Sequence, residues 1–110
     1  MKKIVYNKLI RDKIPQIIEK SGSKPEVSRL DNKNFDLALR KKLLEEAIEV
    51  RKAKTKEDLL NELSDIMEVV NAIAKDHSIL ITDIEKSRKR KFNERGGFEK
   101  RLFLEYTYKV

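Results

Sequence analysis

The sequence has 110 residues, a length that fits one domain (residues 1–110) with one main core and excludes two stacked domains. Charged residues make up 41% and hydrophobic residues 39%, with only 3 Gly, 2 Pro and 6% aromatic residues. This balance favours an all-α helical bundle over turn-rich sandwiches and barrels. The lack of Cys and the single histidine, His77, leave no disulfide, thiolate site or His-based triad, so any metal must be held by oxygen.

The formal net charge of +7 is distributed unevenly along the chain. Residues 1–13 carry five basic and one acidic side chain, and residues 88–101 carry seven basic and two acidic. Residues 45–68, in contrast, carry eight acidic and four basic side chains. An acidic middle between basic ends fits a polyanion bound by metal ions on one side and by Lys and Arg on the other. Plainly solvated charged faces are the alternative.

No secretory or membrane segment is expected. The N-terminus has lysines without a long apolar region, and no stretch approaches the roughly 18 apolar residues of a membrane span. We therefore expect a cytoplasmic protein with no membrane partner. Because one layer of amphipathic helices exposes apolar surface, a partner subunit is also expected.

The first predicted helix begins near Asp12, whose side chain can cap it, tolerates Pro15 in its first turn and stops at Gly22. A loop follows, with a short extended piece over residues 26–30.

Two long helices are predicted next, and their short connection favours an antiparallel hairpin. Asn34 is a candidate N-cap for the first, which continues without Gly or Pro to a break around residues 54–56. Thr55 is the candidate N-cap of the second, which reaches about Lys75.

A fourth helix is predicted over residues 83–93, with Thr82 as its cap and Gly96 just beyond its end. The alternating tail, residues 98–110, suggests a short terminal β-strand pair with residues 4–5. His77, between the second long helix and the fourth helix, is expected at the surface.

Carboxylates occupy apolar faces of the two central helices. On a helical wheel at about 100° per residue, Glu46 lies in the middle of an apolar arc and Glu49 at its edge. The arc is formed by Leu39, Leu43, Val50 and Ala53. Glu62 and Asp65 repeat the arrangement on the next helix, in an arc formed by Leu59, Ile66, Val69 and Ile73.

Packing these carboxylates together requires a positive group between them, because burial and like-charge repulsion both oppose it. The facing arcs contain no Lys or Arg, so we expect Mg²⁺, with Mn²⁺ as an option, held by Glu46, Glu49, Glu62 and Asp65. Carboxylates solvated at the rim, or neutralised by lysines from elsewhere in the fold, are the alternative. Glu45 flanks the site. It either reaches a second ion or orients a water, or it lies on an exposed helix surface.

The pattern Glu45-Glu46-x-x-Glu49, followed after twelve residues by Glu62-x-x-Asp65, resembles the EExxE…ExxD signature of the all-α nucleoside triphosphate pyrophosphohydrolases. This is the MazG-like and phosphoribosyl-ATP pyrophosphohydrolase group. The stretches YNKLIRDKIPQII and ERGGFEKRLFLE resemble a small single-domain MazG-related subgroup.

The resemblance implies a homodimer or homotetramer with a Mg²⁺ site. The implied reaction cleaves a nucleoside triphosphate between the α and β phosphates to the monophosphate and pyrophosphate, often to remove non-standard nucleotides. Matched to the signature, the catalytic carboxylates are Glu45, Glu46 and Glu49, and the metal ligands are Glu46, Glu49, Glu62 and Asp65. Phosphoribosyl-ATP hydrolysis is the nearest enzymatic alternative.

The leaving pyrophosphate also needs cations. The candidate substrate-binding residues are Lys8, Arg11, Lys13, Arg88, Lys91 and Arg95. Solvated surface roles are the alternative for each.

Two non-enzymatic hypotheses are alternatives to a hydrolase function. One is a basic helical module that binds nucleic acid through residues 88–91, with steep salt dependence and no need of Mg²⁺. It accounts for the basic ends and leaves the carboxylates unexplained, so nucleic acid is an unlikely partner. The other is an interaction protein whose acidic pairs dock a basic partner.

Overall fold

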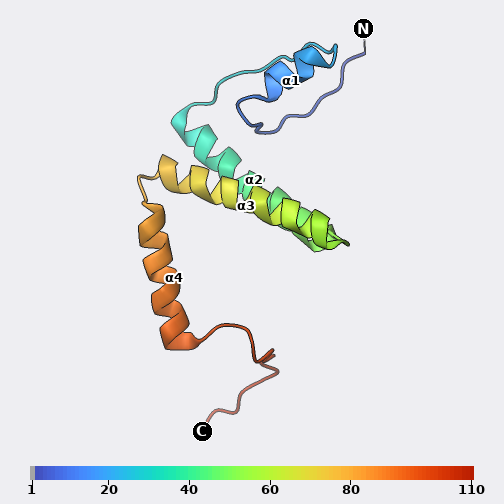
Figure 1. The fold of residues 1–110 in the computed structure, drawn as a ribbon. Coiled ribbons are helices and arrows are strands. Elements are labelled where there is room, and N and C mark those ends of the chain that lie inside the picture. Colours follow the sequence, from blue (N-terminus) through green and yellow to red (C-terminus); the bar gives the residue numbers. More distant parts are fainter. Residues whose placement is uncertain (1) are drawn as a thin grey trace. The chain divides into compact units, whose positions relative to one another are not determined.

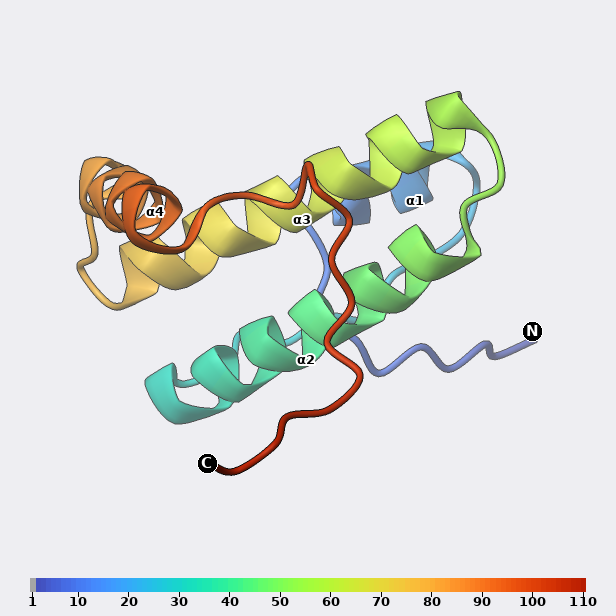
Figure 2. The ribbon, with the colours of Figure 1, turned by 90° about the horizontal axis from the view of Figure 1, so that it is seen from below.

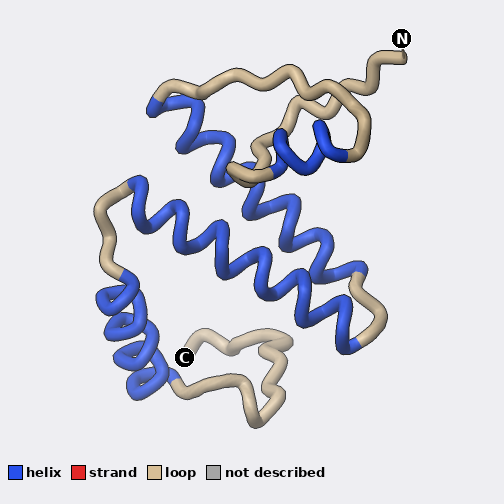
Figure 3. The backbone as a smooth tube through the Cα atoms, turned by 45° about the horizontal axis from the view of Figure 1, so that its top comes forward, coloured by secondary structure: helices blue, strands red, loops and turns tan. Residues whose placement is uncertain are grey.

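The computed structural model describes residues 2–110 as helices joined by irregular backbone (Figure 1). The helices are α1 (Ile14–Lys20), α2 (Asn32–Lys52), α3 (Lys56–Asp76) and α4 (Ile81–Arg95). Figure 3 shows no strand in this part of the chain, which confirms the all-α class. The short terminal strand pair is not formed, since residues 4–5 and 98–110 are irregular.

The contacts within the chain divide it into two compact units, which we describe separately. The first unit ends at Ser78 and contains α1, α2 and α3. The second, Ile79–Val110, contains α4 and the tail. That the 110 residues form a single functional domain stays a prediction.

The first unit is built around an antiparallel hairpin of α2 and α3, as predicted. The two helices pack side by side and are joined by the short link 53–55 (Figure 2). Leu39 of α2 and Val69 and Ala74 of α3 are the buried hydrophobic residues among those that the structure describes. The apolar faces therefore meet between these helices, as the wheel indicates.

The cap of α3 is the one that its sequence predicts. The Thr55 hydroxyl oxygen accepts a hydrogen bond from the Asp58 backbone N–H at 3.0 Å, and Glu57 and Asp58 occupy the first turn. The cap of α2, in contrast, is Asp31 and not Asn34. Asp31 accepts a hydrogen bond from the Asn34 backbone N–H at 2.8 Å, so the helix begins three residues earlier than expected.

The other two helices begin without a side-chain cap. Asp12 does not cap α1, because Lys13 at the cap position already has helical backbone angles. Thr82 lies inside α4, since the Leu80 carbonyl accepts the Asp83 backbone N–H at 3.0 Å and starts the helix at Ile81. The end of α4 is close to prediction: Gly96 follows it with φ of 82°, a conformation that favours glycine.

The hairpin leaves large apolar side chains exposed. On α3 an apolar stripe at helical spacing is formed by Leu60, Leu63 and Met67, and on α2 exposed apolar residues include Leu37, Leu44 and Ile48. Leu44 and Leu60 are 67% and 66% exposed. So much apolar surface is unusual for a monomer. No helix described between residues 2 and 110 is both long and apolar enough to cross a membrane.

Replacing Thr55 by Ala should destabilise the protein by about 0.5–2 kcal/mol, because the Asp58 backbone N–H loses its partner. Urea unfolding at fixed protein concentration measures the change. Thr82→Ala is the matched control, since Thr82 caps no helix, and its effect should be smaller. Equal destabilisation by both substitutions would contradict the assignment of the caps.

Candidate functional site

Three of the four predicted metal ligands come together in the hairpin. Carboxylate oxygens of Glu46 on α2 and of Glu62 and Asp65 on α3 lie within 4.8 Å of one another, and all three residues are half-buried. Glu62 and Asp65 are three residues apart, so they project from the same face of α3. Glu49, one turn after Glu46, is outside this group but close enough to act on the charge of Glu62.

The electrostatics of the cluster are concentrated on Glu62, whose pKa is raised above its usual value. Loss of hydration on burial is the largest cause, followed by repulsion from the charges of Asp65, Glu46 and Glu49. The hairpin therefore holds Glu62 in surroundings that disfavour its ionised form. A cation bound nearby would favour that form.

Two cations of the chain contact the cluster. The expectation that the facing arcs contain no Lys or Arg is wrong for Lys42, while Arg11 comes from outside both helices. Lys42 Nζ lies 3.6 Å from Glu46 Oε1 and 3.8 Å from Glu45 Oε2, and its side chain is 22% exposed. Arg11 Nη2 donates a hydrogen bond of 2.8 Å to Asp65 Oδ1.

These two cations differ in how far the sequence could reveal them. Lys42 precedes Glu46 by four residues, a spacing that places both on one helix face. Arg11 lies 54 residues from Asp65, in the segment before α1, and no local pattern links them. The Arg11 pair is also exposed, and such pairs contribute about 1 kcal/mol or less.

The other candidate phosphate-binding residues are on the surface. In the first unit, Lys8 Nζ lies 5.6 Å from the centre of the Tyr6 ring, and Lys13 is the residue before α1. In the second unit, Arg88 pairs with Glu85 through two nitrogens, at 3.0 and 2.6 Å.

Lys91 and Arg95 are exposed on α4. The Glu85 pairing makes Arg88 a poorer anion ligand than these two.

The donor set of the cluster fits a hard divalent cation. It consists of carboxylate oxygens from two helices, brought close enough to share one ion. Mg²⁺ and Mn²⁺ prefer such oxygen ligands. A cation would offset both the lost hydration and the carboxylate repulsion that raise the pKa of Glu62.

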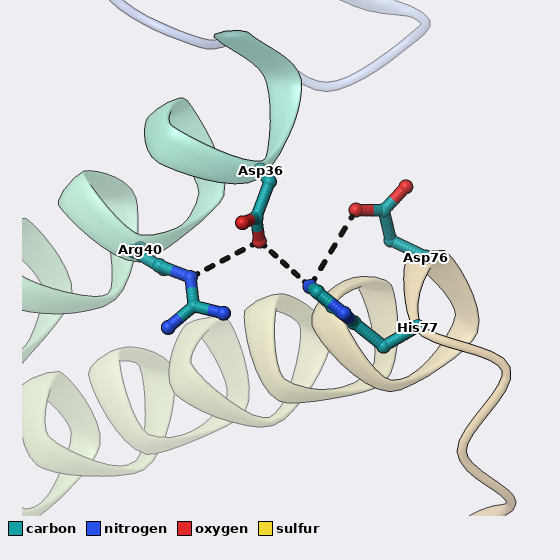
Figure 4. Close-up of polar contacts among 4 residues, drawn as sticks. All are labelled: Asp36, Arg40, Asp76 and His77. Carbon is teal, nitrogen blue, oxygen red and sulfur yellow. Dashed lines mark hydrogen bonds and ion pairs between the residues drawn. The ribbon is translucent and has the colours of Figure 1, made fainter. Parts of the chain in front are cut away.

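A second polar cluster, absent from the sequence predictions, joins the start of α2 to the end of α3 (Figure 4). His77 Nε2 lies 2.7 Å from Asp36 Oδ1 and 3.9 Å from Asp76 Oδ2, and Arg40 Nε donates to the same Asp36 oxygen at 3.0 Å. The hydrogen bond with His77, and then that with Arg40, lowers the pKa of Asp36. His77 is at the surface, as predicted, but it is paired.

These residues also include metal-ligand types. Asp36 Oδ1, however, already bonds to both His77 and Arg40. We therefore describe the group as a polar contact that joins α2 to the end of α3.

Replacing Glu62 by Gln should stabilise the metal-free protein at pH 8. The pKa of Glu62 is raised on folding, so ionised Glu62 opposes folding, and its cost grows as the pH rises above 4.5 through the folded-state pKa. Thermal unfolding in EDTA across this range should show the advantage of E62Q shrinking as the pH falls. Glu68→Gln, on exposed surface of the same helix, is the control. If the unfolding temperature of E62Q at pH 8 is at or below that of the wild type, ionised Glu62 does not oppose folding and the prediction is wrong.

Comparison with known proteins identifies the family of this chain. The family model described as phosphoribosyl-ATP pyrophosphohydrolase matches residues 10–92, which include all of the carboxylates described above. No curated protein and no solved structure matches the sequence. The match confirms the resemblance to the MazG-like and phosphoribosyl-ATP pyrophosphohydrolase group. The chain belongs to the phosphoribosyl-ATP pyrophosphohydrolase family.

Proposed function

We propose that this protein hydrolyses a nucleoside triphosphate between its α and β phosphates, with Mg²⁺, giving the monophosphate and pyrophosphate. The observation that carries the proposal is the convergence of Glu46, Glu62 and Asp65 from two helices in a member of a pyrophosphohydrolase family. Removal of non-standard nucleotides is the role that we favour.

The carboxylates would hold the metal and prepare the attack. Glu46, Glu49, Glu62 and Asp65 are the proposed ligands, with Mn²⁺ able to replace Mg²⁺. When bound, the ion would neutralise phosphate charge and make a water more acidic. Glu45, whose carboxylate lies 3.8 Å from Lys42 Nζ, would orient that water.

The basic side chains would bind the phosphates and stabilise charge on the departing pyrophosphate. Arg11 contacts one of the carboxylates directly, through its ion pair with Asp65. Lys8, Lys13, Lys91 and Arg95 are further candidates, and Arg88 would first have to leave Glu85.

Phosphoribosyl-ATP is a second candidate substrate, favoured by the description of the matching family model. Both substrates present a triphosphate to the carboxylates, so the reacting bond is the same in the two cases. They differ in what lies beyond the α phosphate, and the test therefore has to compare whole substrates.

Incubation with standard and modified nucleoside triphosphates and phosphoribosyl-ATP should give monophosphate and pyrophosphate with Mg²⁺ and none with EDTA. Separation of the nucleotide products identifies both the bond and the preferred substrate. Diphosphate with free phosphate would contradict the assigned bond. Binding of nucleic acid without turnover of any nucleotide would favour the basic helical module.

Glu49→Gln and Asp65→Asn should each lower Mg²⁺-dependent turnover by at least about 100-fold, since loss of a ligand should cost more than loss of an outer-shell partner. Initial rates at saturating Mg²⁺ measure the effect. Glu68→Gln should retain wild-type turnover. Full activity of either ligand variant would remove that residue from the site.

We also propose that the chain is a homodimer or homotetramer, assembled through the apolar stripe of Leu60, Leu63 and Met67. The double substitution Leu60→Glu and Met67→Glu should give a slower-sedimenting species in analytical ultracentrifugation, because two charges would be buried at the contact. Ser23→Glu, in an exposed loop, adds one such charge outside the stripe and should leave the assembly intact. A wild-type protein that sediments as a monomer at tens of micromolar would contradict the proposal.

A further inference from the structure

The ion pair between Arg11 and Asp65 occupies one of the carboxylates proposed to bind the metal. It joins one guanidinium nitrogen to one carboxylate oxygen at 2.8 Å, so it is not the two-bond fork that Arg forms in its strongest carboxylate pairs. The Arg11 side chain is 58% exposed and that of Asp65 is 40% exposed. Solvent therefore reaches both partners and screens their attraction.

The Arg11 side chain is largely exposed, whereas its backbone is held in a turn. The Arg11 carbonyl oxygen accepts the Ile14 backbone N–H at 3.0 Å, which closes the turn before α1. The preceding residues, Leu9 and Ile10, are half-buried. Lys42 contrasts with this arrangement, because its 22% exposed side chain lies between two carboxylates of its own helix.

A divalent cation would compete with Arg11 for the same negative charge. Three carboxylates gather within 4.8 Å, and Arg11 supplies a single positive charge at the edge of the group. An ion with two charges, placed among the oxygens, would cancel the attraction that holds the guanidinium and repel it. An exposed ion pair with a single contact contributes little free energy, so a cation that binds Asp65 can replace it easily.

We propose that Arg11 is an exchangeable counter-ion of this site: it holds Asp65 in the metal-free protein, leaves when a divalent cation binds, and then binds a phosphate oxygen of the nucleotide. The inference rests on the proposed function for the metal and the phosphate. A guanidinium released beside a bound ion suits phosphate, because its planar set of N–H donors matches phosphate oxygens. One residue would thus link metal binding to substrate binding.

The exchange has a signature that other roles lack, namely two effects of opposite sign. Arg11→Gln removes the competitor, so Mn²⁺ should bind about 2- to 5-fold more tightly. The same substitution removes a charged phosphate ligand, so the manganese complex of inorganic pyrophosphate should bind about 10- to 100-fold more weakly. A residue that only orients Asp65 would instead lower metal affinity when it is replaced.

Calorimetric titration of the full-length, metal-free protein tests this without any turnover. The first titrant is Mn²⁺, and the second, added to Mn²⁺-saturated protein, is manganese pyrophosphate. Arg40→Gln is the matched control, since Arg40 also forms an exposed ion pair, of 3.0 Å with Asp36, away from the carboxylate cluster. It should change neither affinity, whereas Arg11→Lys, which keeps the charge, should stay nearer to wild type than Arg11→Gln in both titrations.

Weaker or unchanged Mn²⁺ binding by Arg11→Gln would overturn the exchange, and so would unchanged binding of manganese pyrophosphate. In those cases Mn²⁺ binding by the wild type would leave the proposed function standing. If the wild-type protein binds no Mn²⁺, the metal site itself fails, and the proposed function fails with the exchange.

Discussion

The polar contacts of the first unit depend on one constraint, a cluster of carboxylates at a helix interface that lost hydration and like-charge repulsion both oppose. The α2–α3 hairpin is held by apolar contacts around Leu39, Val69 and Ala74, yet the same pair of helices brings Glu46, Glu62 and Asp65 within 4.8 Å of one another. Apolar burial favours closing the hairpin, and the carboxylates oppose it. Such opposition is expected of a site kept for binding at a cost in stability. The pKa of Glu62 is raised as a result, first by its loss of hydration and then by the charges of Asp65, Glu46 and Glu49.

The remaining polar contacts of the first unit can be understood as compensation. Lys42 and Arg11 place positive charge on the flanking carboxylates, while Glu62 between them forms no ion pair within the described chain. The contact to Asp65 also ties the segment before α1 to the hairpin. At the open end of the hairpin, the bridge from Asp36 to His77 holds the start of α2 against the end of α3. Since few residues are fully buried, these polar ties act where apolar contacts are scarce.

Features set by neighbouring residues could be predicted from the sequence, and those set by distant ones could not. The hairpin, the Thr55 cap and the end of α4 before Gly96 depend on spacing and on local hydrogen bonds. The carboxylate convergence follows from two helical wheels once the helices are antiparallel. The Arg11–Asp65 and Asp36–His77 contacts join residues 54 and 41 positions apart, and no periodic pattern records them. The tail has strand-like alternation, but a strand also needs a partner for its backbone hydrogen bonds.

The residues that would select the substrate differ from those that would act on its phosphates. In the proposed reaction, the carboxylate cluster and a divalent ion would act on the phosphoanhydride, which every candidate substrate shares, so they would not distinguish one nucleotide from another. Discrimination has to come from side chains that contact the ribose and the base, since a specific site rejects an analogue by leaving polar groups unpaired. The family match covers residues 10–92 and leaves residues 93–110 outside it. Membership of the family therefore constrains the reacting bond more strongly than the nucleoside, and substitutions outside the cluster are the ones that should alter specificity at constant chemistry.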